Sequence, residues 1–194
     1  IGCGIEFPLS QMATAVNGVV LQDSTIRNIL SPGGAVCPVG LRYSALSAAV
    51  LGNDFNDSTA ANSEHLIRME LMQGAIIAHN TVANVKTGKE MLSLRAPCSA
   101  ASPCGSAFFG SKGFSGDGAA TKYVVISDNL IKTNTYAGIQ LTQITPTDSA
   151  LIRDIIIERN YLQGTTGGGT GVRVIGNNVT VRNNFIYHNL SGTG

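Results

Sequence analysis

The sequence predicts an all-β protein in which short parallel strands stack as the coils of a solenoid. Four segments, "AIIAHNTV", "VVISDNLI", "IIIERNYL" and "VTVRNNFI", fit one pattern, [VI]-x-x-N-x-[VIL]. The pattern returns at intervals of 24 to 49 residues, and between its copies apolar and polar residues alternate without a helical periodicity of useful length. A repeat of short strands with variable turns is typical of coils that contact only their neighbours.

The repeated asparagine is expected to form a ladder along one turn of every coil. Its positions are Asn53, Asn80, Asn129, Asn160 and Asn184, with Ser24 at the same place in "LQDSTI". An inward carboxamide can donate to one neighbouring coil and accept from the other. Asparagine also tolerates the left-handed backbone conformation of a sharp bend, so we assign the bend to this residue. The alternative role, contact with a ligand, does not explain the repetition.

The number of coils follows from the intervals. The 49 residues between Asn80 and Asn129 are expected to hold two units, the first visible as "EMLSL" and followed by a long inserted loop at 95–121. One domain of about six or seven coils then covers residues 1–194. No polar covering segment follows "NNFIYHNLSGTG", and a bare terminal coil exposes apolar side chains. We therefore expect missing flanking coils in a longer chain, or a capping partner.

The repeat and its ladder resemble the right-handed parallel β-helix of the pectate-lyase-like superfamily, from about Gly18 to Asn189. This resemblance implies a secreted carbohydrate-active protein, such as a polysaccharide lyase, a glycoside hydrolase or a phage tailspike. The motif of no single enzyme family is complete. "RAPCSA" begins like the Arg-x-Pro-x-x-Arg of pectate lyases but has Ala100 in place of the second arginine, and the polygalacturonase motifs are missing. An antiparallel sandwich is the structural alternative, but it gives no reason to repeat an asparagine.

Strand alternation places four polar positions in one row across the coils. These outward positions are Arg68, Ser93, Gln140 and Arg173, and the row continues sideways through Glu70, Arg95 and Thr142. The resemblance implies an elongated groove for an acidic polysaccharide on such a face, and the planar arginine fork suits carboxylates. We expect Arg95, Gln140, Arg173 and Glu70 to bind substrate. A solvated face whose arginines pair with Glu70 is the alternative.

The densest cluster of reactive side chains is "SEHLIRM". A lyase needs a base for the proton alpha to a uronate carboxylate, a cation for that carboxylate and a donor for the leaving oxygen. We assign the cation to Arg68, the base to His65 or Lys89, and the donor to Tyr123 or Tyr136. A structural role for His65 is the alternative.

The predicted function is therefore a lyase-like enzyme that cleaves an acidic polysaccharide by β-elimination. A non-catalytic extracellular β-helix that binds glycan, adheres or serves as a structural element is the second hypothesis. Hydrolysis would need two carboxylates about 5–10 Å apart. Glu64, Glu70, Asp54 and Asp57 are the candidates, and none stands out from ordinary turn acids.

Charge and cysteine content suggest the remaining expectations. The formal net charge is +1 with no long run of either sign, and no apolar stretch reaches the ~20 residues of a membrane-spanning helix, so neither nucleic acid nor membrane is an expected partner. Cys98 and Cys104 suit a local disulfide that leaves Cys3 and Cys37 to pair, which is one of three connectivities, with four buried thiols as the alternative. Disulfides would place the protein outside the cell or in a periplasm. No metal site is expected, and no acidic cluster assigns calcium.

Overall fold

The structure is a computed structural model, and eighteen β-strands account for most of the part that it describes. The described residues are 5–7, 18–27, 41–44, 47–56, 67–70, 72–83, 92–96, 120–132, 138–143, 152–164 and 171–188. The strands form three sheets of six, and every pairing between neighbouring strands is parallel. The chain is a right-handed parallel β-helix, as the sequence predicts.

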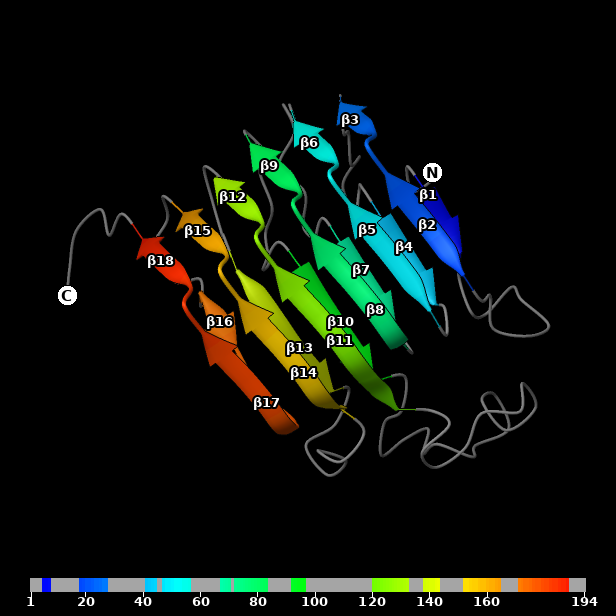
Figure 1. The fold of residues 1–194 in the computed structure, drawn as a ribbon, viewed down its shortest axis with the longest axis vertical. Helices are drawn as coiled ribbons and strands as arrows, with labels where there is room; N and C mark the ends of the chain where they lie inside the picture. The colour runs from blue at the N-terminus through cyan, green and yellow to red at the C-terminus, as the bar shows by residue number, and fades with distance from the viewer. Residues whose placement is uncertain are drawn as a thin grey trace, which may run out of the picture.

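Each coil contributes one strand to each sheet, so six coils are stacked (Figure 1). Sheet A contains β1 (Ile5–Phe7), β4 (Leu41–Ser44), β7 (Ile67–Glu70), β10 (Leu92–Ala96), β13 (Ile139–Gln143) and β16 (Val172–Arg173). Sheet C contains β2 (Val19–Gln22), β5 (Ala48–Leu51), β8 (Gln73–Ala78), β11 (Thr121–Ser127), β14 (Ile152–Glu158) and β17 (Asn177–Arg182). Sheet D contains β3 (Thr25–Arg27), β6 (Asp54–Asn56), β9 (Thr81–Ala83), β12 (Leu130–Lys132), β15 (Tyr161–Gly164) and β18 (Phe185–His188). Sheet A lies behind sheet C in Figure 1, and its strands point the opposite way.

The core is a set of aliphatic columns, because every second residue of a strand faces inward and equivalent residues stack from coil to coil. One column of sheet C consists of Leu21, Val50, Ile77, Ile126, Ile157 and Val181. In sheet A the inward positions Leu92, Leu94, Ile139 and Leu141 are fully shielded. Burial of such a side chain contributes roughly 1.5–3 kcal/mol, so these columns hold the coils together.

The asparagine ladder is continuous through five coils. Asn53, Asn80, Asn129 and Asn160 each donate from Nδ2 to Oδ1 of the next asparagine at 2.9 Å. The same Nδ2 atoms also donate to a backbone carbonyl of the preceding coil, as Asn129 does to Ile77 at 2.9 Å. Oδ1 of each of the last four asparagines accepts a second bond, from the backbone N–H of the preceding ladder residue. Oδ1 of Asn53 accepts the backbone N–H of Ser24 at 3.1 Å. The predicted ladder is confirmed, and its inner amides are fully hydrogen-bonded.

The left-handed bend lies one residue earlier than the sequence analysis assigns it. The residues with positive φ at this turn are Asp23, Gly52, His79, Asp128, Arg159 and Asn183, with φ between 49° and 64°. Each of them directly precedes the ladder residue. The assignment of the bend to the asparagine is therefore wrong, because the backbone turns before the carboxamide enters the core.

The interval between Asn80 and Asn129 contains one coil and not two. Asn80 bonds directly to Asn129, and β10, β11 and β12 belong to the same coil. The extra length lies between the end of β10 at Ala96 and the start of β11 at Thr121. The predicted inserted loop thus separates two strands of one coil, and its residues 97–119 lie outside the described part of the chain.

The last coil is open to solvent on its outer side. Val181 and Ile186 face inward, yet they are 44% and 45% exposed, whereas their partners Ile157 and Leu162 are fully buried. At the other end, Val19 and Leu21 of the first coil are buried. The open coil is of the kind that a capping partner or flanking coils would cover, and that covering stays a prediction.

Candidate functional site

The outer positions of sheet A align as the strand alternation predicts. Arg68 pairs with Ser93, Ser93 with Gln140 and Gln140 with Arg173, in one row across four coils. The second row also forms, because Glu70 pairs with Arg95 and Arg95 with Thr142. Four segments far apart in the sequence therefore meet on one sheet.

This face is not uniformly open. Ser93 is completely buried and Gln140 is only 8% exposed, whereas Arg173 at the end of the row is exposed. Arg95 donates from Nε to the Ser93 hydroxyl in a long hydrogen bond of 3.4 Å. The middle of the predicted groove is thus shielded from solvent, and the substrate-binding role of Gln140 stays a prediction.

An additional arginine extends the row toward the first coil. Arg42 pairs with Arg68, and Glu6 pairs with Arg42 on the other side. "LRYS" has the same alternation as "IRME" in the next coil, and this was the signal in the sequence. Arg42 precedes Asn53 by 11 residues, much as Arg68 precedes Asn80 by 12, so the same spacing could have identified it. Two arginine positions side by side on parallel strands are unfavourable unless an anion or another partner compensates them.

Several other candidate residues do not join this face in the described structure. Tyr123 lies on β11 of sheet C and not on sheet A with Arg68, and its role as proton donor stays a prediction. His65, Lys89 and Tyr136 lie outside the described residues, as do all four cysteines at positions 3, 37, 98 and 104. The base and the disulfides therefore stay predictions.

A cluster of charged side chains lines the bend beside the ladder. Arg159 donates to both carboxylate oxygens of Asp128, from Nε at 2.8 Å and from Nη2 at 2.9 Å. It also donates from Nη1 to Glu158 at 2.5 Å, and Arg182 donates from Nε to the other oxygen of Glu158 at 2.6 Å. The cluster joins three successive coils through charge-assisted bonds.

These contacts hold both carboxylates in their charged form. The hydrogen bond from Arg159 lowers the pKa of Asp128, and the hydrogen bonds from Arg182 and then Arg159 lower the pKa of Glu158. The same bonds, first that to Asp128, raise the pKa of Arg159. A carboxylate with a lowered pKa is a weak base, so the cluster is suited to joining coils and not to proton transfer.

Metal-binding groups and membrane-spanning helices are absent from the described residues. Among them, no three His, Cys, Asp or Glu side chains are grouped to hold a metal ion, which leaves calcium unassigned. The described segments also contain no helix with the length and apolarity needed to cross a bilayer. In the comparisons with known proteins, no family model, no curated protein and no solved structure matches the chain.

Proposed function

We propose that this protein binds an acidic polysaccharide along the outer face of sheet A and cleaves it by β-elimination, as a member of the pectate-lyase-like superfamily. The fold and the asparagine ladder support this relationship. A polysaccharide substrate of this kind also supports a location outside the cell or in a periplasm. The register of Arg42, Arg68 and Arg173 on one sheet is the observation on which the proposal rests.

The arginine row suits a chain of uronates. Arginine binds a carboxylate through two parallel hydrogen bonds, which gives both orientation and charge compensation. Arg42 and Arg68 hold neighbouring positions of the row, so a substrate carboxylate bound there would face two cationic residues. At the other end of the row, Arg173 is exposed and available to a second acidic sugar.

The reaction requires three groups around one uronate. A base takes the proton from the carbon alpha to the carboxylate, and the electron pair forms a double bond to the neighbouring carbon. The glycosidic oxygen leaves that neighbouring carbon and receives a proton. In our proposal Arg68 stabilises the negative charge that builds up on the carboxylate, and His65 or Lys89 is the base.

A non-catalytic glycan-binding protein is the second candidate, and the burial of Ser93 and Gln140 favours it. These residues separate Arg68 from Arg173, so a shielded section lies between the two arginines. Binding at separate points of a long polymer tolerates this arrangement. Catalysis instead needs the base, the cation and the donor to converge on one sugar.

To test the proposal, the protein is incubated with pectate, alginate and glycosaminoglycans, and cleavage is followed by the ultraviolet absorbance of unsaturated uronate. Arg68→Ala and Arg173→Ala are compared with Arg27→Ala, a change on sheet D where Arg27 lies 3.9 Å from Asp54. Cleavage that Arg68→Ala abolishes and Arg27→Ala preserves would support the lyase. Retention on immobilised glycan without cleavage would support the binder, and neither retention nor cleavage would refute both.

A further inference from the structure

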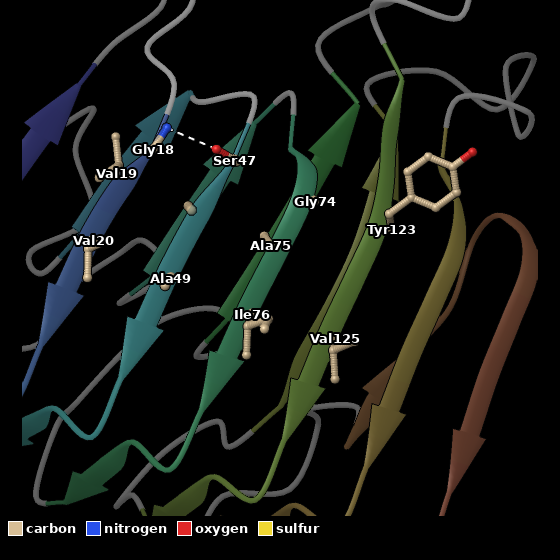
Figure 2. Close-up of a pocket in the computed structure, with 11 residues that line it drawn as sticks. Gly18, Val19, Val20, Ser47, Ala49, Gly74, Ala75, Ile76, Tyr123 and Val125 are labelled. Atoms are coloured by element: carbon tan, nitrogen blue, oxygen red, sulfur yellow. Dashed lines mark hydrogen bonds between the residues drawn. The ribbon is translucent and has the colours of Figure 1, made fainter.

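A second surface feature lies on sheet C, away from the arginine row. It is a hollow of about 520 Å³ across the outer sides of β2, β5, β8 and β11 (Figure 2). One row of its lining consists of the register partners Val20, Ala49, Ile76 and Val125. Val20 is 63% exposed and Ile76 is 49% exposed. Exposed apolar patches of this kind are a common sign of a binding surface.

The hollow exists because the residues beside this row have a small side chain or none. Gly18, Ser47 and Gly74 lie next to it on three successive coils, and a Cβ atom added to either glycine would meet nothing within 4 Å. The Ser47 hydroxyl already accepts a hydrogen bond from the Gly18 N–H at 2.9 Å. Apart from that hydroxyl and the hydroxyl of Tyr123, the lining side chains are hydrocarbon, which disfavours a sugar ring that needs several polar partners.

Tyr123 forms the far wall of the hollow and has an unusual backbone. Its φ is 57°, and Gly74, Asp154 and Asn178 take the equivalent left-handed position in neighbouring coils. Glycine, aspartate and asparagine adopt this conformation readily, whereas a bulky aromatic residue is strained in it. The strained backbone displays a phenol ring that is 58% exposed at the edge of the hollow.

The ring of Tyr123 lies beside two cationic side chains. The Nζ atom of Lys122 is 5.6 Å from its centroid, and the guanidinium carbon of Arg153 is 5.7 Å from it. Arg153 also pairs with Asp154, so charged side chains of both signs lie beside Tyr123 at this end of the hollow. The opposite end, at Val20 and Ala49, is aliphatic. The site therefore runs from a hydrocarbon end to an end beside which Lys122 and Arg153 lie.

We propose that this hollow binds an amphiphilic carboxylate, with its hydrocarbon chain on the aliphatic row and its acid group toward Lys122 and Arg153. Four parallel strands about 4.8 Å apart make the row about 14 Å long, which accommodates a hydrocarbon chain of medium length. The hollow also has the volume of an ordinary small-molecule site. This binding is independent of the polysaccharide proposed for sheet A.

Titration calorimetry with dodecanoate, below the concentration at which it forms micelles, tests this proposal. Ile76→Asp places a carboxylate on the aliphatic row and is expected to weaken binding at least tenfold. Tyr123→Asn removes the aromatic wall, replaces it with a residue already found at the equivalent Asn178, and is expected to weaken binding severalfold. Both positions are exposed, so folding should survive, and hydrogen-exchange protection of the ladder amides checks that it does.

Two controls separate this site from other apolar surface. Thr180→Asp lies on the same outward row but in the last coil, outside the hollow, and Val181→Asp changes the open end. Both are expected to bind dodecanoate like the unaltered protein, and dodecanol is expected to bind more weakly than dodecanoate. The proposal would be overturned if dodecanoate did not bind measurably, or if dodecanol bound as tightly as dodecanoate. It would also be overturned if Ile76→Asp bound dodecanoate as tightly as the unaltered protein, or if Val181→Asp lost dodecanoate binding.

Discussion

The side-chain oxygen of Asn160 accepts two hydrogen bonds from Asn129, one from the side-chain amide at 2.9 Å and one from the backbone N–H at 3.1 Å. Asn129 has the same relationship to Asn80 on its other side. One carboxamide therefore fixes both the register of two coils and the bend between two sheets. The ladder is more than a set of independent side-chain contacts, because each member satisfies backbone groups of the preceding coil.

Removal of an inner ladder residue should be costly. Asn129→Ala leaves the side-chain and backbone N–H groups of Asn80 and the carbonyl of Ile77 without their partner. Each buried group left unpaired costs about 1–3 kcal/mol, so the free energy of unfolding should fall by several kcal/mol. Urea denaturation measures the change. Asn184→Ala is the control, because that end of the ladder is partly exposed and water can replace the lost bonds; an equal loss for both variants would contradict this account.

The open end of the solenoid predicts a difference between two valines of one column. Val50 is fully buried and Val181 is 44% exposed, although both occupy the same inward column of sheet C. Val50→Ala should lower the free energy of unfolding by about 2 kcal/mol, since it removes buried methyl groups and leaves a cavity. Val181→Ala should change it by less than about 0.5 kcal/mol. Thermal and urea unfolding of the two variants provide the comparison, and a similar loss at Val181 would show that the last coil is covered in solution.

The charged cluster predicts a dependence of stability on pH. The pKa values of Asp128 and Glu158 are lowered by their arginine partners, so this stabilisation is present above the unfolded-state values near about 4 and is lost as the pH falls through the folded-state values. Arg159→Gln should therefore lower the free energy of unfolding at neutral pH. The difference in this free energy between the variant and the unaltered protein should shrink below about pH 5. Chemical denaturation between neutral and acid pH tests this expectation. Arg27→Gln is the matched control, and a difference for Arg159→Gln that is constant with pH would argue against the proposed role of the cluster.

The backbone of Tyr123 predicts a stabilising substitution. Tyr123→Asn replaces a strained aromatic residue with one that tolerates a positive φ, and should raise the free energy of unfolding by about 1 kcal/mol. Tyr123→Ala is the comparison, because alanine removes the ring but keeps most of the backbone strain. Urea denaturation of both variants measures the gain. Equal stability of the asparagine and alanine variants would mean that the ring and not the backbone determines the effect.

Much of this architecture could be predicted from the sequence because its determinants are local and repeated. The alternation around Arg68 and Ser93 predicts which residues share a row, and the repeated asparagine predicts the ladder. The position of the bend could not be assigned in the same way. Asp23, Gly52, Asp128 and Asn183 are of types that tolerate a positive φ, but Arg159 is not, so this position repeats less regularly than the asparagine that follows it.

The features that escaped prediction depend on contacts between coils. Alternation predicts on which side of a strand Ser93 and Gln140 lie, but it does not show that they are shielded. The hollow on sheet C arises where small residues of three coils, Gly18, Ser47 and Gly74, lie side by side. Their common position becomes visible only when the register is known. The 49-residue interval from Asn80 to Asn129 is likewise compatible with one coil or two on sequence alone. The hydrogen bond between the two side chains shows that it is one coil.

Nuclear magnetic resonance of the asparagine carboxamides tests the stacked, in-register coils most directly. Assigned side-chain amide protons of Asn80, Asn129 and Asn160 should exchange slowly with solvent and show magnetisation transfer from each residue to the next. Single Asn→Ala variants provide the assignments. Carboxamide protons that exchange as fast as those of free asparagine would contradict the β-helix and with it the arginine row of sheet A. Magnetisation transfer between strands that run in opposite directions would contradict them equally.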